Sequence, residues 1–220
     1  MRVRLESQKR RAELSVNNLI KSVKRPKKTP LNYEKVIERA SDRRVIREMG
    51  GYWKLNGNSL QLYESGRGLI VHRNGKTRYA FQQGVIPENS YPWHSHPYSQ
   101  GWWPSTENLV SVRRSEYRPH IIFTKWGVWV FRKSRNTNLK LDTEYNKLFN
   151  DFNKDIYAKT EDLYKAKSQK EFNDIFNWTS RGIMEYWKPK FEEFGISITF
   201  FRTQEKSRLV EFLKTDIEER

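Results

Sequence analysis

Asn-Gly dipeptides set between apolar, β-prone runs are the feature that most restricts how this chain can fold. Asn-Gly readily adopts the left-handed turn conformations that join two antiparallel strands tightly, so each such site predicts a β-hairpin. Asn56-Gly57 joins Tyr52–Leu55 to Ser59–Tyr63, and Asn74-Gly75 joins Gly68–His72 to Thr77–Phe81. Two hairpins so close together predict a β-sheet in the first half of the chain.

Helical periodicity lies on both sides of these hairpins. Apolar residues at three- and four-residue spacing predict helices over residues 32–48, over 141–177 with continuation to Phe194, and over 205–218. Shorter or weaker patterns predict helices over residues 5–23 and 106–115, strands at Ile121–Thr124 and Val128–Phe131, and a strand over 196–201. We therefore expect an α/β or α+β fold, a mixed sheet flanked by helices. Its parts would be a basic arm over 1–30, a core domain over 31–140, and a helical C-terminal portion over 141–220 that adds the 196–201 strand to the same domain.

Positive charge is concentrated in the first two-thirds of the chain. The net charge is +16, and residues 1–50 hold fifteen Lys or Arg against six Asp or Glu. Residues 51–140 hold thirteen against four, whereas residues 141–220 hold fourteen against sixteen. A field of this sign favours polyanionic or acidic partners, such as nucleic acid or the acidic surfaces of a large protein assembly.

The densest cationic cluster lies in the arm and consists of Lys24, Arg25, Lys27 and Lys28. Such a cluster is typical of a phosphate-contacting patch or a nuclear-localisation signal, and equally of a solvated linker. Burying four neighbouring cations in a self-contained domain would leave charges without partners. We therefore expect the arm to contribute little to the core and to lie along a neighbouring molecule.

Cysteine and long apolar runs are both missing from the sequence. Zero cysteines exclude disulfides and thiolate ligands and fit a reducing compartment. No apolar run reaches the roughly 20 residues that a membrane-spanning helix needs. The first residues are charged rather than apolar, so we expect no secretory signal peptide. The expected location is inside the cell or within a particle such as a virion or a ribonucleoprotein, without a membrane partner.

Two of the four histidines, His94 and His96, are one residue apart in a stretch with strand character. Positions i and i+2 of a strand point to the same face, so both imidazoles can converge on one point. A divalent metal held by nitrogen ligands is the chemistry that this spacing supports, with zinc as the first expectation. The other two histidines, His72 and His120, are interpreted as structural or surface residues.

The stretch around these histidines resembles the JAMM/MPN-type zinc metallopeptidases, a family that includes isopeptidases acting on ubiquitin-like modifiers. His94 and His96 match the family's paired zinc ligands, and Pro97 matches the proline that follows them. Glu64, followed by Gly66-Arg67-Gly68-Leu69-Ile70, resembles the family's glutamate on an early strand. The resemblance extends over roughly residues 60–131 and implies a JAMM/MPN-like core.

The third metal ligand departs from the family pattern. Eight residues separate His96 from Ser105, one more than the common spacing in the family. Aligning on Ser105 puts Asn108 where the family has its aspartate ligand, whereas counting from His96 puts Glu107 there. An amide brings no charge to offset a dication, so Glu107 is the alternative third ligand. The resemblance is therefore to a compact, viral-type member with a degenerate third ligand.

The resemblance also implies catalytic roles for Glu64 and Ser105. Zinc held by three protein ligands lowers the pKa of a bound water toward about 7. Glu64 would act as general base and Ser105 would donate a hydrogen bond to the oxyanion of a peptide or isopeptide substrate. Each residue also has a plain structural interpretation, Glu64 as an exposed strand residue and Ser105 as a helix N-cap.

Two functions stay open on the sequence alone. The first is a zinc-dependent peptidase or isopeptidase, favoured by the retained Glu64, His94, His96 and Ser105. The second is a non-catalytic scaffolding subunit that keeps a degenerate JAMM fold, favoured by Asn108 and the basic arm. Compact JAMM-like proteins that resemble this one occur among viral proteins, so a viral particle is the expected assembly, with a ribonucleoprotein as the alternative.

Overall fold

In the part of the chain that the computed structural model describes, eight strands form one large sheet and one small ribbon. The structure describes residues 29–73, 76–98, 104, 119–133 and 142–218. Within them the strands are β1 (Met49–Asn56), β2 (Ser59–Glu64), β3 (Arg67–Arg73), β4 (Lys76–Gln82), β5 (Tyr91–Ser95), β6 (His120–Phe123), β7 (Gly127–Lys133) and β8 (Ile196–Arg202). The two predicted hairpins are confirmed as β1–β2 and β3–β4, the strands predicted at 121–124 and 128–131 pair as β6 and β7, and the strand predicted at 196–201 is β8.

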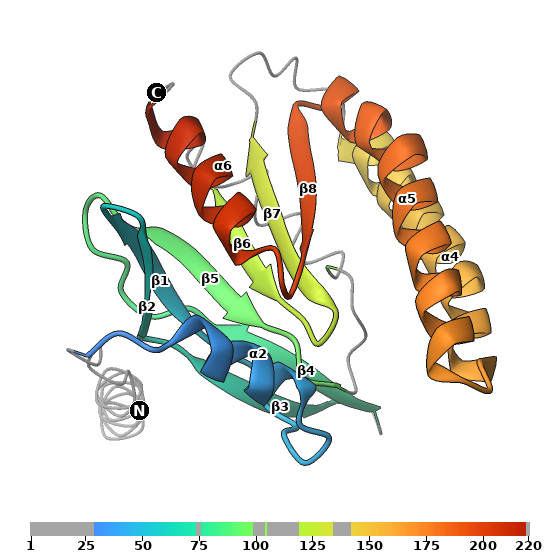
Figure 1. Cartoon of the computed structure of the whole chain (residues 1–220), viewed down its shortest axis with the longest axis horizontal. Coiled ribbons are helices and arrows are strands. Elements are labelled where there is room, and N and C mark those ends of the chain that lie inside the picture. Colours follow the sequence, from blue (N-terminus) through green and yellow to red (C-terminus); the bar gives the residue numbers. More distant parts are fainter. Residues whose placement is uncertain (1–28, 74–75, 99–103, 105–118, 134–141, 219–220) are drawn as a thin grey trace, which may run out of the picture.

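The large sheet is mixed and has the strand order β2-β1-β5-β6-β7-β8, whereas β3 and β4 pair only with each other (Figure 1). All neighbours in the large sheet are antiparallel except β5 and β6, which run parallel. Pairing of β8 with β7 brings the C-terminal portion of the chain into the same sheet as the β1–β2 and β6–β7 hairpins. The predicted fold class, a mixed sheet flanked by helices, is confirmed.

The first described helix, α2 (Tyr33–Ser41), is shorter than the helix predicted over residues 32–48. Asn32 caps its start, because its side-chain oxygen accepts a hydrogen bond of 2.8 Å from the backbone N–H of Glu34. Just beyond its end, the side chain of Asp42 accepts a hydrogen bond of 2.9 Å from the backbone N–H of Arg44. This side-chain-to-backbone bond forms a turn that competes with helix, which is why the predicted extension to residue 48 was wrong.

The long helix predicted over residues 141–194 is instead two helices, α4 (Asp142–Lys165) and α5 (Gln169–Glu193). Ser168 caps the start of α5, since its hydroxyl accepts a hydrogen bond of 3.1 Å from the backbone N–H of Glu171. The carboxylate of Glu171 accepts a hydrogen bond of 2.8 Å from the backbone N–H of Lys167, so Ser168 and Glu171 cap the helix together. The helices predicted over 5–23 and 106–115, and the arm itself up to residue 28, lie outside the described residues.

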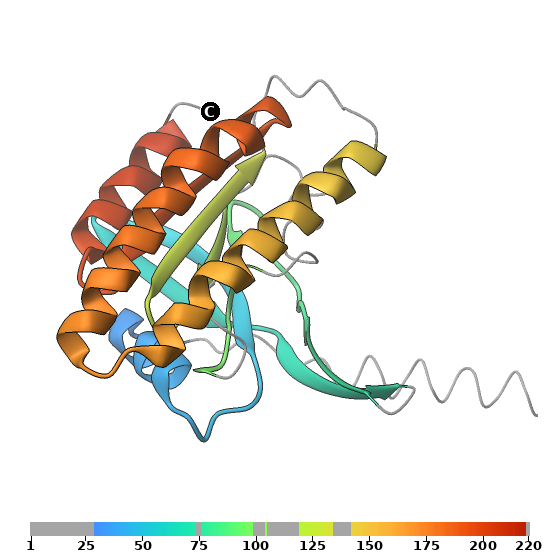
Figure 2. The same ribbon diagram turned by 90° about the vertical axis from the view of Figure 1, so that its right-hand side faces the viewer.

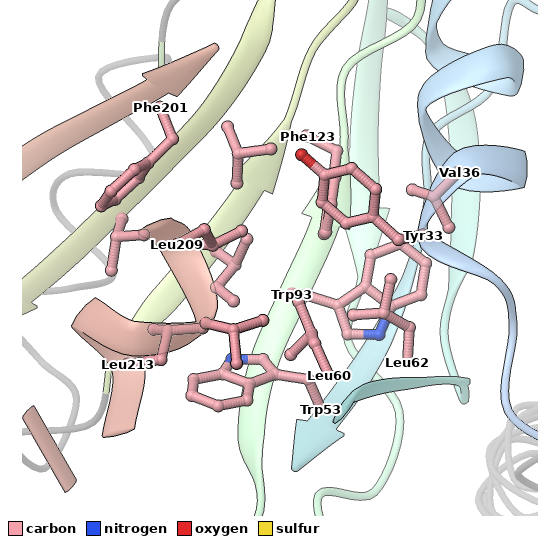
Figure 3. Close-up of a cluster of buried hydrophobic side chains, with 14 of the residues drawn as sticks. Tyr33, Val36, Trp53, Leu60, Leu62, Trp93, Phe123, Phe201, Leu209 and Leu213 are labelled. Atoms are coloured by element: carbon pink, nitrogen blue, oxygen red, sulfur yellow. The ribbon is translucent and has the colours of Figure 1, made fainter. Parts of the chain in front are cut away.

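One face of the large sheet, here called the α2/α6 face, is covered by α2 and by the last helix, α6 (Lys206–Glu218). Figure 3 shows Leu209 and Leu213 of α6 beside Trp53, and Tyr33 of α2 beside Phe123. The core on this face consists of Tyr33, Val36, Met49, Trp53, Leu60, Leu62, Trp93, Ile121, Phe123, Val128, Val130, Phe201, Leu209, Val210 and Leu213.

The opposite face, here called the α4/α5 face, is covered over β6, β7 and β8 by the α4–α5 pair (Figures 1 and 2). Ile122, Trp129 and Ile198 of the sheet pack there against Phe152 and Phe191 of the helices. Strand alternation therefore divides neighbouring residues between two separate cores. Among the described residues, no helix combines the length and the apolarity needed to span a bilayer.

Candidate metal centre

His94 and His96 lie side by side on the α4/α5 face, at the end of β5. His94 is opposite Ile122 of β6, whose side chain belongs to the core of that face. The backbone N–H of His96 donates to the carbonyl of Phe123 at 2.8 Å, so strand geometry continues past the end of β5. The two Nε2 atoms are 3.3 Å apart, and both residues are buried, 2% and 3% exposed. The predicted convergence of the two rings is therefore present.

The separation of the two Nε2 atoms fits a shared zinc ion. Two nitrogen ligands about 2.0–2.1 Å from zinc at tetrahedral positions are about 3.3 Å apart. Within the described residues, no group of three His, Asp or Glu side chains converges on one point. The other predicted site residues, Ser105, Glu107 and Asn108, lie outside the described residues.

His120, interpreted from the sequence as structural or surface, lies against the opposite side of the His94 ring. Its Nε2 is 2.8 Å from Nδ1 of His94, and the two ring planes are 69° apart. The three imidazoles thus form a chain with His94 in the middle, one nitrogen facing His96 and the other facing His120. Burial, with a smaller contribution from the charge of His96, lowers the pKa of His120 to about 4, so this ring is neutral near pH 7.

A phenylalanine of the β3–β4 ribbon covers His94. The ring of Phe81 stacks on the imidazole with centroids 5.8 Å apart and planes 12° apart. Two glycines make this approach possible, because a Cβ on Gly50 would lie 2.7 Å from the Phe81 ring and a Cβ on Gly66 would overlap the ring. Larger residues at either position would displace Phe81 and uncover the histidines.

Two cations lie against the ring of Tyr98, a residue close to the histidine pair in the sequence. Tyr98, two residues after His96, has Nζ of Lys125 3.5 Å from its ring centroid and the guanidinium of Arg43 at 5.0 Å. Burial acts to raise the pKa of the Tyr98 phenol, but Lys125 and Arg43 outweigh it and lower that pKa. Burial in turn lowers the pKa of Lys125. Positive charge therefore surrounds Tyr98 and favours the ionised form of its phenol.

Glu64, the predicted general base, is not placed with the histidines by the sheet register. It lies opposite Gly51 of β1, and Gly51 lies opposite Trp93 of β5. Directly opposite residues share a face, and Trp93 belongs to the α2/α6 core. His94, the next residue after Trp93, faces the other way. The catalytic role of Glu64 stays a prediction, and this register does not favour it.

A different glutamate, Glu48, lies one residue before β1, the strand that pairs with the histidine-bearing β5. β1 pairs with β5 through Met49↔Ser95 and Gly50↔His94, so the same register continued by one residue places Glu48 opposite His96. Met49 is buried in the α2/α6 core, and alternation therefore places Glu48 on the α4/α5 face. Glu48 is half-buried, and Gly68 of β3 lies directly against its backbone.

Sequence reasoning missed Glu48. In the sequence, Glu48 is a glutamate directly before a strand that begins Met49-Gly50-Gly51. This position indicates a site residue only once β1 is known to pair with β5. The chain matches no known family model, no curated protein and no solved structure. Its candidate site is defined by the arrangement of Glu48, His94, His96 and His120.

Proposed function

We propose that this chain is a zinc-dependent hydrolase of the JAMM type, in which His94 and His96 hold the metal and Glu48 moves the proton. The observation that carries this proposal is the 3.3 Å approach of two buried imidazole nitrogens. Continued by one residue beyond Met49↔Ser95, the register of β1 and β5 would put Glu48 opposite His96, which supports this choice of base. The substrate implied by the JAMM resemblance is a peptide or isopeptide carbonyl.

Zinc at this site would supply Lewis acidity, which activates water and polarises a carbonyl. The Glu48 carboxylate would accept the proton of the attacking water and return it to the leaving amine. Phe81, stacked on His94, limits the access of bulk water to the ring. Ser105 would stabilise the oxyanion, and Glu107 or Asn108 would complete the ligand set, as the resemblance implies.

Metal content and hydrolysis of the full chain test the proposal together. We expect the purified protein to retain zinc and to cleave peptide- or isopeptide-linked substrates in a mass-spectrometric assay. Activity should be lost after treatment with a chelator and should return when zinc is added back, because the water-activating group leaves with the metal. Absence of bound zinc after zinc loading, or hydrolysis that survives chelation, would reject the zinc mechanism.

A second function, recruitment to a polyanion-rich assembly as a structural subunit, is favoured by charge and by the shape of the β3–β4 ribbon. The ribbon, teal in Figure 2, extends beyond the large sheet. Residues 65–87, which contain it, include four Lys or Arg and no Asp or Glu. Together with the arm cluster at residues 24–28, this composition suits a phosphate backbone. This second function does not exclude the first.

Salt dependence of nucleic-acid binding tests this second function. We expect the full chain to bind double-stranded RNA or DNA with an affinity that falls as salt rises. For B-DNA, a plot of the logarithm of the binding constant against the logarithm of the salt concentration should have a slope of about −0.9 per phosphate contact. Removing residues 1–28 should reduce the size of that slope, since the deletion takes away the four clustered cations of the arm. The shortened chain should still fold, because it keeps Leu31, whose backbone N–H donates a 2.6 Å hydrogen bond to the carbonyl of Leu62 in β2. Equal slopes for the two chains in a fluorescence-anisotropy titration would show that the arm does not contact nucleic acid.

A further inference from the structure

We propose that His120 is a positioning residue that fixes the orientation and the tautomer of His94, so that Nε2 of His94 faces the metal. This inference rests on the proposed zinc function. It concerns a residue with no counterpart in the resemblance, and it follows from the contacts of the three histidines.

The bond between His94 and His120 is shorter than the contact between His94 and His96. Nδ1 of His94 and Nε2 of His120 are 2.8 Å apart, the distance of a well-formed hydrogen bond, whereas the Nε2 atoms of His94 and His96 are 3.3 Å apart. A neutral imidazole carries one N–H. If Nδ1–H of His94 donates to His120, the lone pair of His94 Nε2 is directed toward His96, the side where a metal ion would be shared.

The sheet holds the two rings in place. β5 and β6 are parallel neighbours, with Trp93 opposite Ile121 and His94 opposite Ile122. His120 is two residues before Ile122, so it shares the face of His94. Both rings are therefore carried by adjacent strands at the centre of the sheet rather than by a loop, which limits how far either can move.

Hydrogen bonding by the second ring nitrogen is what a metal-binding histidine requires. Such a histidine usually donates its free N–H to a carboxylate, a carbonyl or water, and loss of that partner typically weakens metal binding by about 10–100-fold. Phe81 restricts the plane of the His94 ring by stacking on it, but its ring has no acceptor that selects a tautomer. The neighbouring imidazole of His120 supplies that acceptor.

Three variants of the full chain separate positioning from packing. His120→Leu removes the acceptor, His120→Gln keeps an acceptor near the position of Nε2, and Ile122→Val perturbs the same face of β6 without touching the bond. With Co²⁺ as a spectroscopic probe and Zn²⁺ as competitor, we expect His120→Leu to bind metal about 10–100-fold more weakly. His120→Gln should restore most of the affinity, and Ile122→Val should bind like the wild type.

A second measurement does not depend on metal. In zinc-free, ¹⁵N-labelled protein, we expect a scalar coupling across the hydrogen bond between His94 Nδ1 and His120 Nε2, which His120→Leu abolishes. Metal binding without this coupling, or equal metal affinity in the wild type and His120→Leu, would overturn the positioning role alone. The coupling without any metal binding would overturn the zinc function, and with it the need to position His94.

Discussion

Replacing Glu48 with glutamine is expected to lower kcat/KM for peptide or isopeptide hydrolysis by about 10²–10⁴-fold, the usual contribution of a general base. Glutamine keeps the size of the side chain but cannot accept a proton. The metal should stay in place, because the two imidazole nitrogens of His94 and His96 that would hold it converge at 3.3 Å. Kinetics and zinc content, measured on the same preparation, check both parts of the prediction.

Glu64→Gln is the matched control for this experiment. Both glutamates are half-buried and both lie at a strand end, but the register places them on opposite faces of the sheet. We expect Glu64→Gln to keep activity close to that of the wild type. The opposite result, a loss in Glu64→Gln with Glu48→Gln fully active, would show that the β1–β5 register does not identify the base.

The choice between these two glutamates shows where sequence reasoning reached its limit. Hairpins were predictable because Asn56-Gly57 and Asn74-Gly75 specify tight turns within a few residues. Which hairpin strand lies beside the histidines is a long-range property, since β1 pairs with β5 across about forty residues of chain. Glu64 matched a local motif, whereas the position of Glu48 emerged only from that pairing.

The same limit applies to His120 and to the helix ends. His120 follows a long connection after His96, and only the parallel pairing of β5 with β6 brings it to His94. The end of α2 and the break before α5 depend on the side chains of Asp42 and Ser168, which bond to nearby backbone N–H groups. Periodicity alone does not detect such local competition. The paired histidines were predictable because their convergence needs only a strand with period two.

Under the proposed zinc function, loss of His94 or of His96 is expected to remove the stabilisation that bound zinc would give the folded chain. At a free zinc concentration one hundred times Kd, binding to the native state alone adds about 2.7 kcal/mol to the free energy of unfolding. For a domain of this size that raises Tm by roughly 5–10 °C. We expect His94→Ala and His96→Ala to show no such rise in a calorimetric scan, whereas His72→Ala, which alters the histidine outside the trio, should keep it.

The quantity to compare is the difference between the scans with and without zinc, because His94→Ala also has a cost that is independent of metal. It removes the stacking of Phe81 on the imidazole and the 2.8 Å bond to His120, and His94 itself is a buried residue. His94→Ala should therefore unfold at a lower temperature even without zinc. His96→Ala leaves both the Phe81–His94 stack and the His94–His120 bond in place, so it is the cleaner variant. A zinc-dependent rise in Tm that survives in His96→Ala would place the metal elsewhere in the protein and would reject the two-histidine centre.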